Sequence, residues 1–205
     1  MMNLANLINK ITAGNCVDLM GYLPDNSIDM CITSPPYDNL RTYKGYKFPF
    51  NEIAKELFRV IKGGGVVVWV VNDATINGTE TGTSFKQALK FKEIGFNIHD
   101  TMIFMKTNPI PQIYRKRYTN VFEYMFVFSK GPVKTHNPLK VPCMHAGLEL
   151  KGTTYKNFST GIQTRSKIAK PVKGEKIRGN VWEYVVGKRL LIKKQKGILH
   201  HFHMI

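Results

Sequence analysis

The sequence predicts an α/β fold built on a doubly wound, mostly parallel sheet. Helical and strand patterns alternate along the chain up to about residue 131. The run VVVWVV, residues 66–71, is continuously apolar, which is typical of a central parallel strand covered on both faces. Polar loops follow two of the predicted strands, and such sheets bind their ligands at those strand ends.

Each element has its own local pattern. Asn15 can cap a first helix, whose apolar residues fall at positions 16, 19, 20 and 23. A second helix is predicted over 50–61, and Lys62 with the three glycines after it ends that helix. Ser84 can cap a third helix, and Gly95 can end it. The predicted strands are 28–33, 66–71, 98–106 and 121–131.

The charge balance indicates a polyanionic partner. The chain has 30 lysines and arginines against 14 acidic residues, a net charge of +16. A positive field favours nucleic acid as the binding partner. The alternative is a basic protein that binds no polyanion. No apolar run is long enough for a membrane span, so no membrane partner is expected.

The cysteines and the first residues point to a reducing compartment. Three widely separated cysteines indicate neither a disulfide framework nor zinc-ligand spacing. The opening MMNLANLINK has no signal-peptide pattern. We therefore expect a cytoplasmic protein without a metal site. The three histidines at 200, 201 and 203 have no carboxylate or cysteine beside them to complete a site.

The motif Ser34-Pro35-Pro36-Tyr37 directly follows the predicted strand 28–33. Two prolines remove two backbone donors and fix two φ angles, so the chain holds one rigid shape there. A serine oxygen and the carbonyl of Pro35 could accept hydrogen bonds from the exocyclic amine of a flipped nucleobase, while Tyr37 stacks on its plane. Such catalysis would rest on positioning and electrostatics. A proline-stiffened turn is the purely structural alternative.

The chain resembles the amino-methyltransferases of DNA, which methylate adenine N6 or cytosine N4 with S-adenosylmethionine. Their catalytic motif is [DNS]-P-P-[YFW], matched here by residues 34–37. The resemblance includes the lead-in GNCVDLMGYLPDNSIDMCITSPPYDNL and the following FPFNEIAKELFRVIKGGGVVVWVV. It continues to GNVWEY and so covers nearly the whole chain to about Tyr184.

The resemblance implies a Rossmann-like methyltransferase sheet, S-adenosylmethionine as cofactor and double-stranded DNA as partner, in a restriction–modification setting. The catalytic motif precedes the recognition segment, which is the permuted, β-type order. Residues 1–131 then form the catalytic part and 132–180 the target-recognition segment. Residues 181–205 begin the cofactor half and continue into an aberrant tail.

The chain departs from the family pattern in its cofactor motif. No Phe-x-Gly-x-Gly turn is found in the sequence. We therefore expect the sheet to be incomplete at the C-terminal cofactor half, with the last residues out of register with the family, as after a frameshift. Such a chain should be marginally stable and nearly inactive, and its exposed sheet edge could lead to dimers or other association.

Several further residues are candidates for binding. Cofactor contacts are predicted for Asn15, Asp18, Thr33 and Asp73, with helix capping as the competing interpretation of the first two. DNA phosphate contacts are predicted for basic side chains in polar loops, with plain solvation as the alternative: Arg41, Lys106, Arg115, Lys116 and Arg117. Glu123 lies inside an apolar strand, so we expect it to have either a buried partner or a role in the site.

Three questions stay open at this stage. The serine of the motif leans toward cytosine N4, but adenine N6 is not excluded as target. The chain could be a truncated, inactive remnant that still binds DNA. The same fold could also act on RNA or on a protein amide, although the serine argues against protein-glutamine methylation.

Overall fold

A five-stranded mixed sheet forms the body of the protein, in a computed structural model that describes residues 7–36, 48–111, 116–150, 154–156, 159–165 and 170–186. Its strand order is β1 (Ile28–Thr33), β2 (Ile61–Val71), β6 (Phe122–Ser129), β5 (Asn97–Lys106) and β13 (Val181–Tyr184). The pairs β1–β2 and β5–β13 are parallel, whereas β6 is antiparallel to both of its neighbours. Four of the five strands therefore run in one direction, and the predicted α/β class with a mostly parallel sheet is confirmed.

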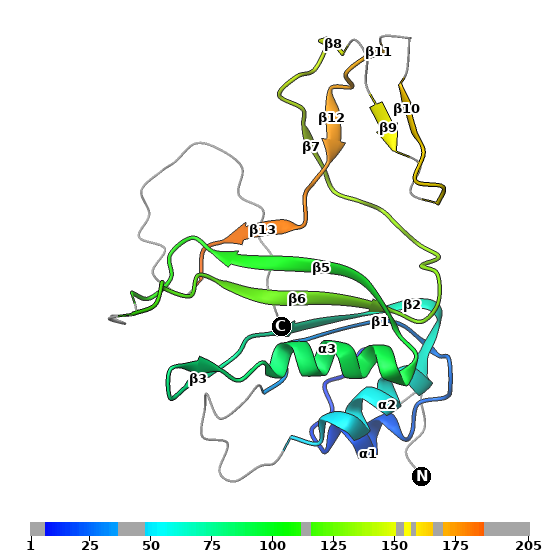
Figure 1. Cartoon of the computed structure of the whole chain (residues 1–205). Helices are drawn as coiled ribbons and strands as arrows, with labels where there is room; N and C mark the ends of the chain where they lie inside the picture. Colours follow the sequence, from blue (N-terminus) through cyan, green and yellow to red (C-terminus); the bar gives the residue numbers. More distant parts are fainter. Residues whose placement is uncertain are drawn as a thin grey trace.

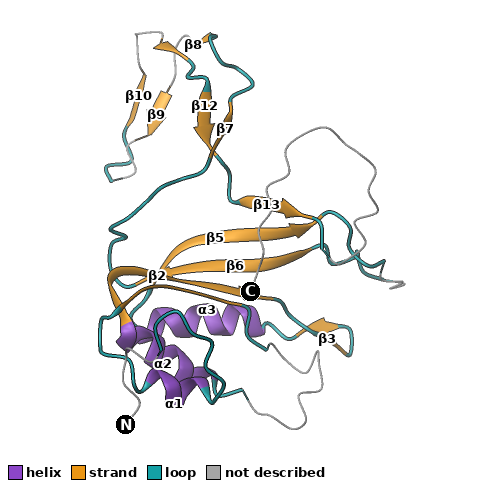
Figure 2. Cartoon of the chain, turned by 180° about the vertical axis from the view of Figure 1, so that it is seen from behind, coloured by secondary structure: helices purple, strands orange, loops and turns teal. Residues whose placement is uncertain are grey.

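Three helices, α1 (Cys16–Met20), α2 (Phe50–Val60) and α3 (Thr83–Ile94), lie together on one face of the sheet (Figures 1 and 2). Side chains from α2 and α3 bury the alternate residues Val67, Trp69 and Val71 of β2. Phe91 of α3 is central to this core, with Phe128 of β6 stacked on it at a centroid distance of 4.3 Å. Apolar burial on this face is the main term that stabilises the sheet.

Cover of both sheet faces was expected from the run at 66–71, but burial along β2 alternates instead. In the described residues no helix lies on the second face (Figure 1). That face carries apolar side chains, because residues in register on neighbouring strands share a face. They include Met30, Ile32, Val68, Phe104 and Met125.

The glycines 63–65 are part of β2, whereas the sequence predicted that they end a helix and precede the strand. They form an irregular step, since Ile28 pairs with Ile61 but Met30 pairs with Val66. Gly64 has a φ of +86°, and a Cβ on Gly65 would lie 2.6 Å from the Asp29 carbonyl oxygen. Close backbone approach is what these glycines provide.

The residues after β6 form an arm on the side of the sheet opposite the helices (Figures 1 and 2). Its strands are β7 (Lys140–Pro142), β8 (Glu149–Leu150), β9 (Thr154–Lys156), β10 (Gln163–Arg165), β11 (Lys170–Pro171) and β12 (Glu175–Ile177). They pair antiparallel as β7–β12, β8–β11 and β9–β10, which are three separate two-stranded sheets. The chain then returns to the sheet as β13, at the edge opposite β1.

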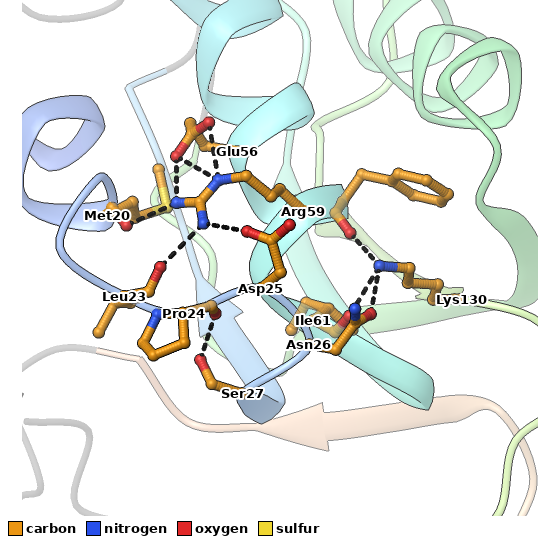
Figure 3. A network of polar contacts seen from close by, with 11 residues as sticks. Met20, Leu23, Pro24, Asp25, Asn26, Ser27, Glu56, Arg59, Ile61 and Lys130 are labelled. Atoms are coloured by element: carbon orange, nitrogen blue, oxygen red, sulfur yellow. Dashed lines mark hydrogen bonds and ion pairs between the residues drawn. The ribbon is translucent and has the colours of Figure 1, made fainter.

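Arg59 of α2 locks the amino end of β1 to the helices (Figure 3). Its guanidinium donates to the carboxylates of Glu56 and Asp25, each at 2.6 Å, and to the carbonyls of Met20 and Leu23, each at 2.8 Å. The hydrogen bonds to Glu56 and Asp25 raise the pKa of Arg59. One planar cation thus joins the end of α1, the following turn and α2.

Lys130 makes a second lock beside it (Figure 3). Its ammonium donates to Asn26 Oδ1 at 2.8 Å and to the carbonyls of Phe58 at 2.6 Å and Ile61 at 3.0 Å. A cation near the last carbonyls of a helix satisfies groups that the helix leaves unpaired. This contact explains why α2 can end at Val60 and pass directly into β2.

Of the three predicted helix-end residues Asn15, Gly95 and Ser84, two are confirmed and one is wrong. Asn15 accepts a hydrogen bond from the Val17 amide at 2.9 Å, so its capping role is confirmed. Gly95 ends α3 with a φ of 122°, as predicted. Ser84 does not cap α3, because the helix begins at Thr83 and a carboxylate from the end of β2 takes that role.

Candidate active site

Ser34, Pro35 and Pro36 leave the sheet at the carboxyl end of β1. Thr33, the last residue of β1, is in register with Trp69 of β2, so both parallel strands end at the same edge. Ser34 is exposed there, Pro35 is buried and Pro36 is half-buried. The serine is therefore presented to solvent on a segment that its two prolines hold rigid. The predicted Tyr37 and Arg41 lie outside the described residues.

Aromatic side chains support this edge from the helix side. The chain is described again from Phe48, whose ring lies 6.3 Å from Trp69, and Phe50 lies 5.9 Å from the same indole. The indole nitrogen of Trp69 donates to Gln87 Oε1 at 2.9 Å in the core. Trp69 thus contacts Phe48 and Phe50 through its ring and is the register partner of Thr33 in the sheet. A hollow lined by residues 48–52 opens beside these rings.

Asp73 follows β2 at the same edge and holds α3 in place. Its carboxylate accepts from the Ser84 amide at 2.9 Å, from the Ser84 hydroxyl at 2.5 Å and from the Thr81 hydroxyl at 3.2 Å. A carboxylate at a helix N-terminus satisfies free amides and complements the helix dipole. Asp73 was predicted to contact a cofactor, but in this structure its oxygens are used within the fold.

Asn72 ties the end of β2 to the start of β6. Its amide nitrogen donates to the Phe122 carbonyl at 3.1 Å, and its oxygen accepts from the Asp73 amide at 2.9 Å and from Asn120 at 3.3 Å. Asn120 in turn accepts from the Phe122 amide at 3.2 Å. Sequence reasoning missed both asparagines, although Asn72 stands directly after an apolar strand, where a polar residue was the available signal.

A short hairpin extends from the same edge and is held by Arg117. The hairpin consists of β3 (Thr75–Ile76) and β4 (Thr79–Glu80), joined at Asn77-Gly78 with positive φ at both residues. This is the turn chemistry that two-residue hairpins require. Arg117 donates to the Gly78 carbonyl and pairs with Glu80 at 3.3 Å.

Lys106 and Glu123 form an ion pair on the second face of the sheet. The ammonium and the carboxylate are 2.5 Å apart, with side-chain exposures of 23% and 16%. The expected partner of Glu123 is therefore found in Lys106, which was predicted to contact DNA phosphates. Lys116 is exposed on the loop between β5 and β6, and Arg115 lies outside the described residues.

Besides Arg59, two described side chains, Tyr124 and Cys31, have shifted pKa values. Burial raises the pKa of Tyr124 on β6, and the nearby carboxylates of Asp73 and Glu80 raise it further. Burial also raises the pKa of the Cys31 thiol on β1. Both changes favour the neutral form, so Cys31 lacks the electropositive setting of a nucleophilic cysteine.

The structure brings together Thr33, Ser34 and Asp73 at one edge of the sheet, as predicted. Asn15 instead caps α1, and Asp18 is exposed in the first turn of that helix. Within the described ranges, no group of three or more histidine, cysteine or acidic side chains could hold a metal ion. No helix in the same ranges is both long and apolar enough to cross a membrane.

Comparison with known proteins gives matches along most of the chain. A family model described as DNA methylase matches residues 28–201. The orphan methyltransferase M.BamHII of Bacillus amyloliquefaciens is 60% identical over 116 residues, 56% of this chain and 43% of that protein. The type II methyltransferase M.BglII of Bacillus subtilis is 26% identical over 152 residues, 68% of this chain and 41% of that protein.

A solved structure has a similar fold. The PvuII DNA methyltransferase, described as cytosine-N4-specific, aligns with a TM-score of 0.56 and 16% identity. The alignment covers 85% of this chain and 56% of that one. The matches span less than half the length of the curated relatives given above, and at this identity the PvuII enzyme is a guide to fold alone.

Proposed function

This chain belongs to the DNA methylase family, and on that premise we propose that it methylates the exocyclic amine of a base flipped out of double-stranded DNA. The observation that carries the proposal is the placement of Ser34-Pro35-Pro36 at the carboxyl end of β1, beside the end of the parallel β2. Ligands of open α/β sheets bind at this edge. The setting is DNA modification in the cytoplasm, as in a restriction–modification system.

The chemistry we assign to this segment is hydrogen-bond acceptance. An exocyclic amine is a weak nucleophile because its lone pair is delocalised into the ring. The Ser34 hydroxyl and the Pro35 carbonyl oxygen can accept its two N–H bonds and draw the nitrogen toward a tetrahedral shape. Pro36 fixes the direction of that carbonyl, and Tyr37 stacks on the base. The gain comes from acceptors that are in place before the reaction.

The methyl donor we propose is S-adenosylmethionine, which would supply the electrophilic methyl group. The described residues fit it poorly. Asn15 already caps α1, and the oxygens of Asp73 hold Thr81 and Ser84. Thr33 and Asp18 remain candidates, and the family's Phe-x-Gly-x-Gly turn is not found in this sequence. The role that we assign within the described residues is therefore hydrogen-bond acceptance from the base by Ser34 and Pro35.

The arm is the segment we propose for recognition of the DNA target. Residues 132–180 hold eight lysines and two arginines against two glutamates, a net charge of +8 out of the chain's +16. A two-stranded antiparallel ribbon fits the major groove, and its cations would contact phosphates. In this division, residues 1–131 carry the chemistry and residues 181–205 begin the cofactor half.

The β1 edge is the place where we propose that the chain associates with other polypeptide. β1 has a strand partner on one side only in the described residues. Met30 and Ile32 on this strand are 54% and 64% exposed. An unpaired edge with apolar side chains is a ready surface for another strand, including that of a second copy.

A chimera tests the chemistry. A segment of this chain that includes Ser34 would replace the corresponding segment of M.BamHII, and duplex DNA would be incubated with the chimera and labelled S-adenosylmethionine. Nucleoside mass spectrometry should then find methylated cytosine or adenine, and the serine of the motif favours N4-methylcytosine. Ser34→Ala in the chimera should abolish transfer while leaving DNA binding unchanged. Transfer near the full rate by the Ser34→Ala form would refute the assigned role.

The second candidate is a DNA-binding remnant without activity. The observation that favours DNA binding on its own is the basic arm, whose residues 132–180 carry a net charge of +8. For this candidate the 205-residue chain should bind duplex DNA with a steep salt dependence, and the chimera should transfer no methyl group. A transferring chimera would exclude it for the segment exchanged.

A further inference from the structure

Tyr118 is the most exposed large apolar or aromatic side chain of the described residues, with a relative exposure of 101%. It lies on the loop between β5 and β6, which projects from the edge of the sheet where the hairpin β3–β4 also projects (Figures 1 and 2). β1 and β5 run in the same direction, so Ser34 and this loop both follow carboxyl ends. At this exposure the ring is available to a ligand that approaches the edge, and an aromatic ring can stack on a nucleobase.

The backbone around Tyr118 is held on both sides. Arg117 is fixed to the hairpin through the Gly78 carbonyl and Glu80. Two residues after the tyrosine, Asn120 donates to Asn72 at 3.3 Å, and Lys106 donates its amide to the Val121 carbonyl at 2.7 Å. The ring is therefore presented from an anchored segment. Presenting a side chain in a fixed place lowers the entropy cost of any contact that it makes.

The spacing of the sheet places this ring within reach of a duplex whose base enters the site. Two strand spacings separate β1 from β6, which is about 10 Å. The major groove of DNA is about 12 Å wide. One duplex lying on this edge can therefore contact both the segment after β1 and the loop between β5 and β6. Lys116, two residues before the tyrosine, is exposed and can contact a phosphate beside it.

We propose that Tyr118 is a wedge that enters the base stack at the position the target base leaves. The inference rests on the proposed function, because a base must be flipped before a gap exists. Removing a base from the stack is costly, and several DNA-bending proteins insert an apolar side chain between base steps. Tyr118 is a positioning residue, since it contacts the duplex and stabilises the flipped state without touching the reacting amine.

An abasic duplex tests the wedge without knowledge of the recognition sequence. Two 20-base-pair duplexes of the same sequence would differ only by one tetrahydrofuran site, with 2-aminopurine next to it. At a single salt concentration, the full chain should bind the gapped duplex more tightly and quench the 2-aminopurine by stacking. Tyr118→Ala should lower affinity for the gapped duplex about tenfold, as expected for loss of one stacked ring, and abolish the quenching.

Matched variants separate the wedge from other roles. Tyr118→Phe should keep both the preference and the quenching. Tyr22→Ala, which removes a half-exposed tyrosine after α1, should behave as the parent chain. The proposal is overturned if Tyr118→Ala retains the preference, if the parent chain has none, or if only Ile110→Ala on the same loop loses it. These outcomes are independent of methyl transfer by the chimera, so failure of the wedge and failure of the proposed function are distinguishable.

Discussion

Replacement of Asp73 by alanine should destabilise the fold by about 2–4 kcal/mol. The carboxylate accepts three hydrogen bonds, two from Ser84 and one from Thr81, and Ser84 is fully buried. Loss of a cap costs about 1 kcal/mol, and a buried donor left unpaired costs about 1–3 kcal/mol more. Loss of the negative charge at the start of α3 adds a few tenths.

Urea unfolding followed by far-ultraviolet circular dichroism measures this change. Asp73→Asn should cost less than Asp73→Ala, because the amide keeps one acceptor for the Ser84 amide. Asp100→Asn, which changes an exposed carboxylate on β5, is the matched control and should stay within about 0.5 kcal/mol of the parent. Asp73→Ala combined with Ser84→Ala should cost less than the sum of the two, because both remove the same contact.

A different result would mean that Asp73 does not serve α3. If Asp73→Ala unfolds at the same urea concentration as the parent and only weakens binding of S-adenosylmethionine, the carboxylate is a cofactor ligand. The capping argument would then be wrong, although the hydrogen-bond geometry would still need an explanation. Full additivity with Ser84→Ala would count against the contact in the same way.

Three further changes can be measured on the same chain. Arg59→Ala should lower the unfolding free energy by about 2–4 kcal/mol, and Arg59→Lys should not restore it because an ammonium cannot form the planar fork. Lys55→Ala on the exposed side of α2 is the control. An equal loss of unfolding free energy in Lys55→Ala would contradict the argument. Tyr124 has a raised pKa, so its stabilisation is complete below about pH 10 and is lost as the pH rises through the folded value. Urea curves at alkaline pH should show this loss, and Tyr124→Phe should remove it. Ile32→Lys should shift any dimer toward monomer in sedimentation, whereas unchanged association would place the contact elsewhere.

The order of elements could be predicted from local patterns, because each element has a local signature. The helical period over 50–61 and the apolar run at 66–71 gave α2 and the main part of β2. The true start of β2 at Ile61 could not be predicted. Its glycines allow the backbone to approach Asp29 and Lys130, two residues that lie far away in the sequence. The cap of α3 was missed for the same reason, because its carboxylate lies 11 residues from Ser84.

The site was predictable to the extent that it is encoded in one segment. The placement of Ser34 follows from the motif and the strand before it. The partners of the basic residues could not be predicted, because the sequence around a lysine or arginine does not show which carboxylate it will pair with. Lys106 meets Glu123 across two strands, and Arg117 meets Glu80 on a hairpin. Two of the five predicted phosphate contacts therefore have internal partners in the fold.

The two ends of the sheet have different kinds of contact, and this difference is consistent with the roles that we propose for Ser34 and Tyr118. At the amino end of β1, Arg59 and Lys130 satisfy backbone carbonyls and carboxylates with short hydrogen bonds (Figure 3). At the carboxyl end, Ser34 and Tyr118 remain exposed on segments fixed by their neighbours. A site for DNA needs unsatisfied groups in fixed places, and the locked amino end can stabilise the sheet without using the groups at the carboxyl end.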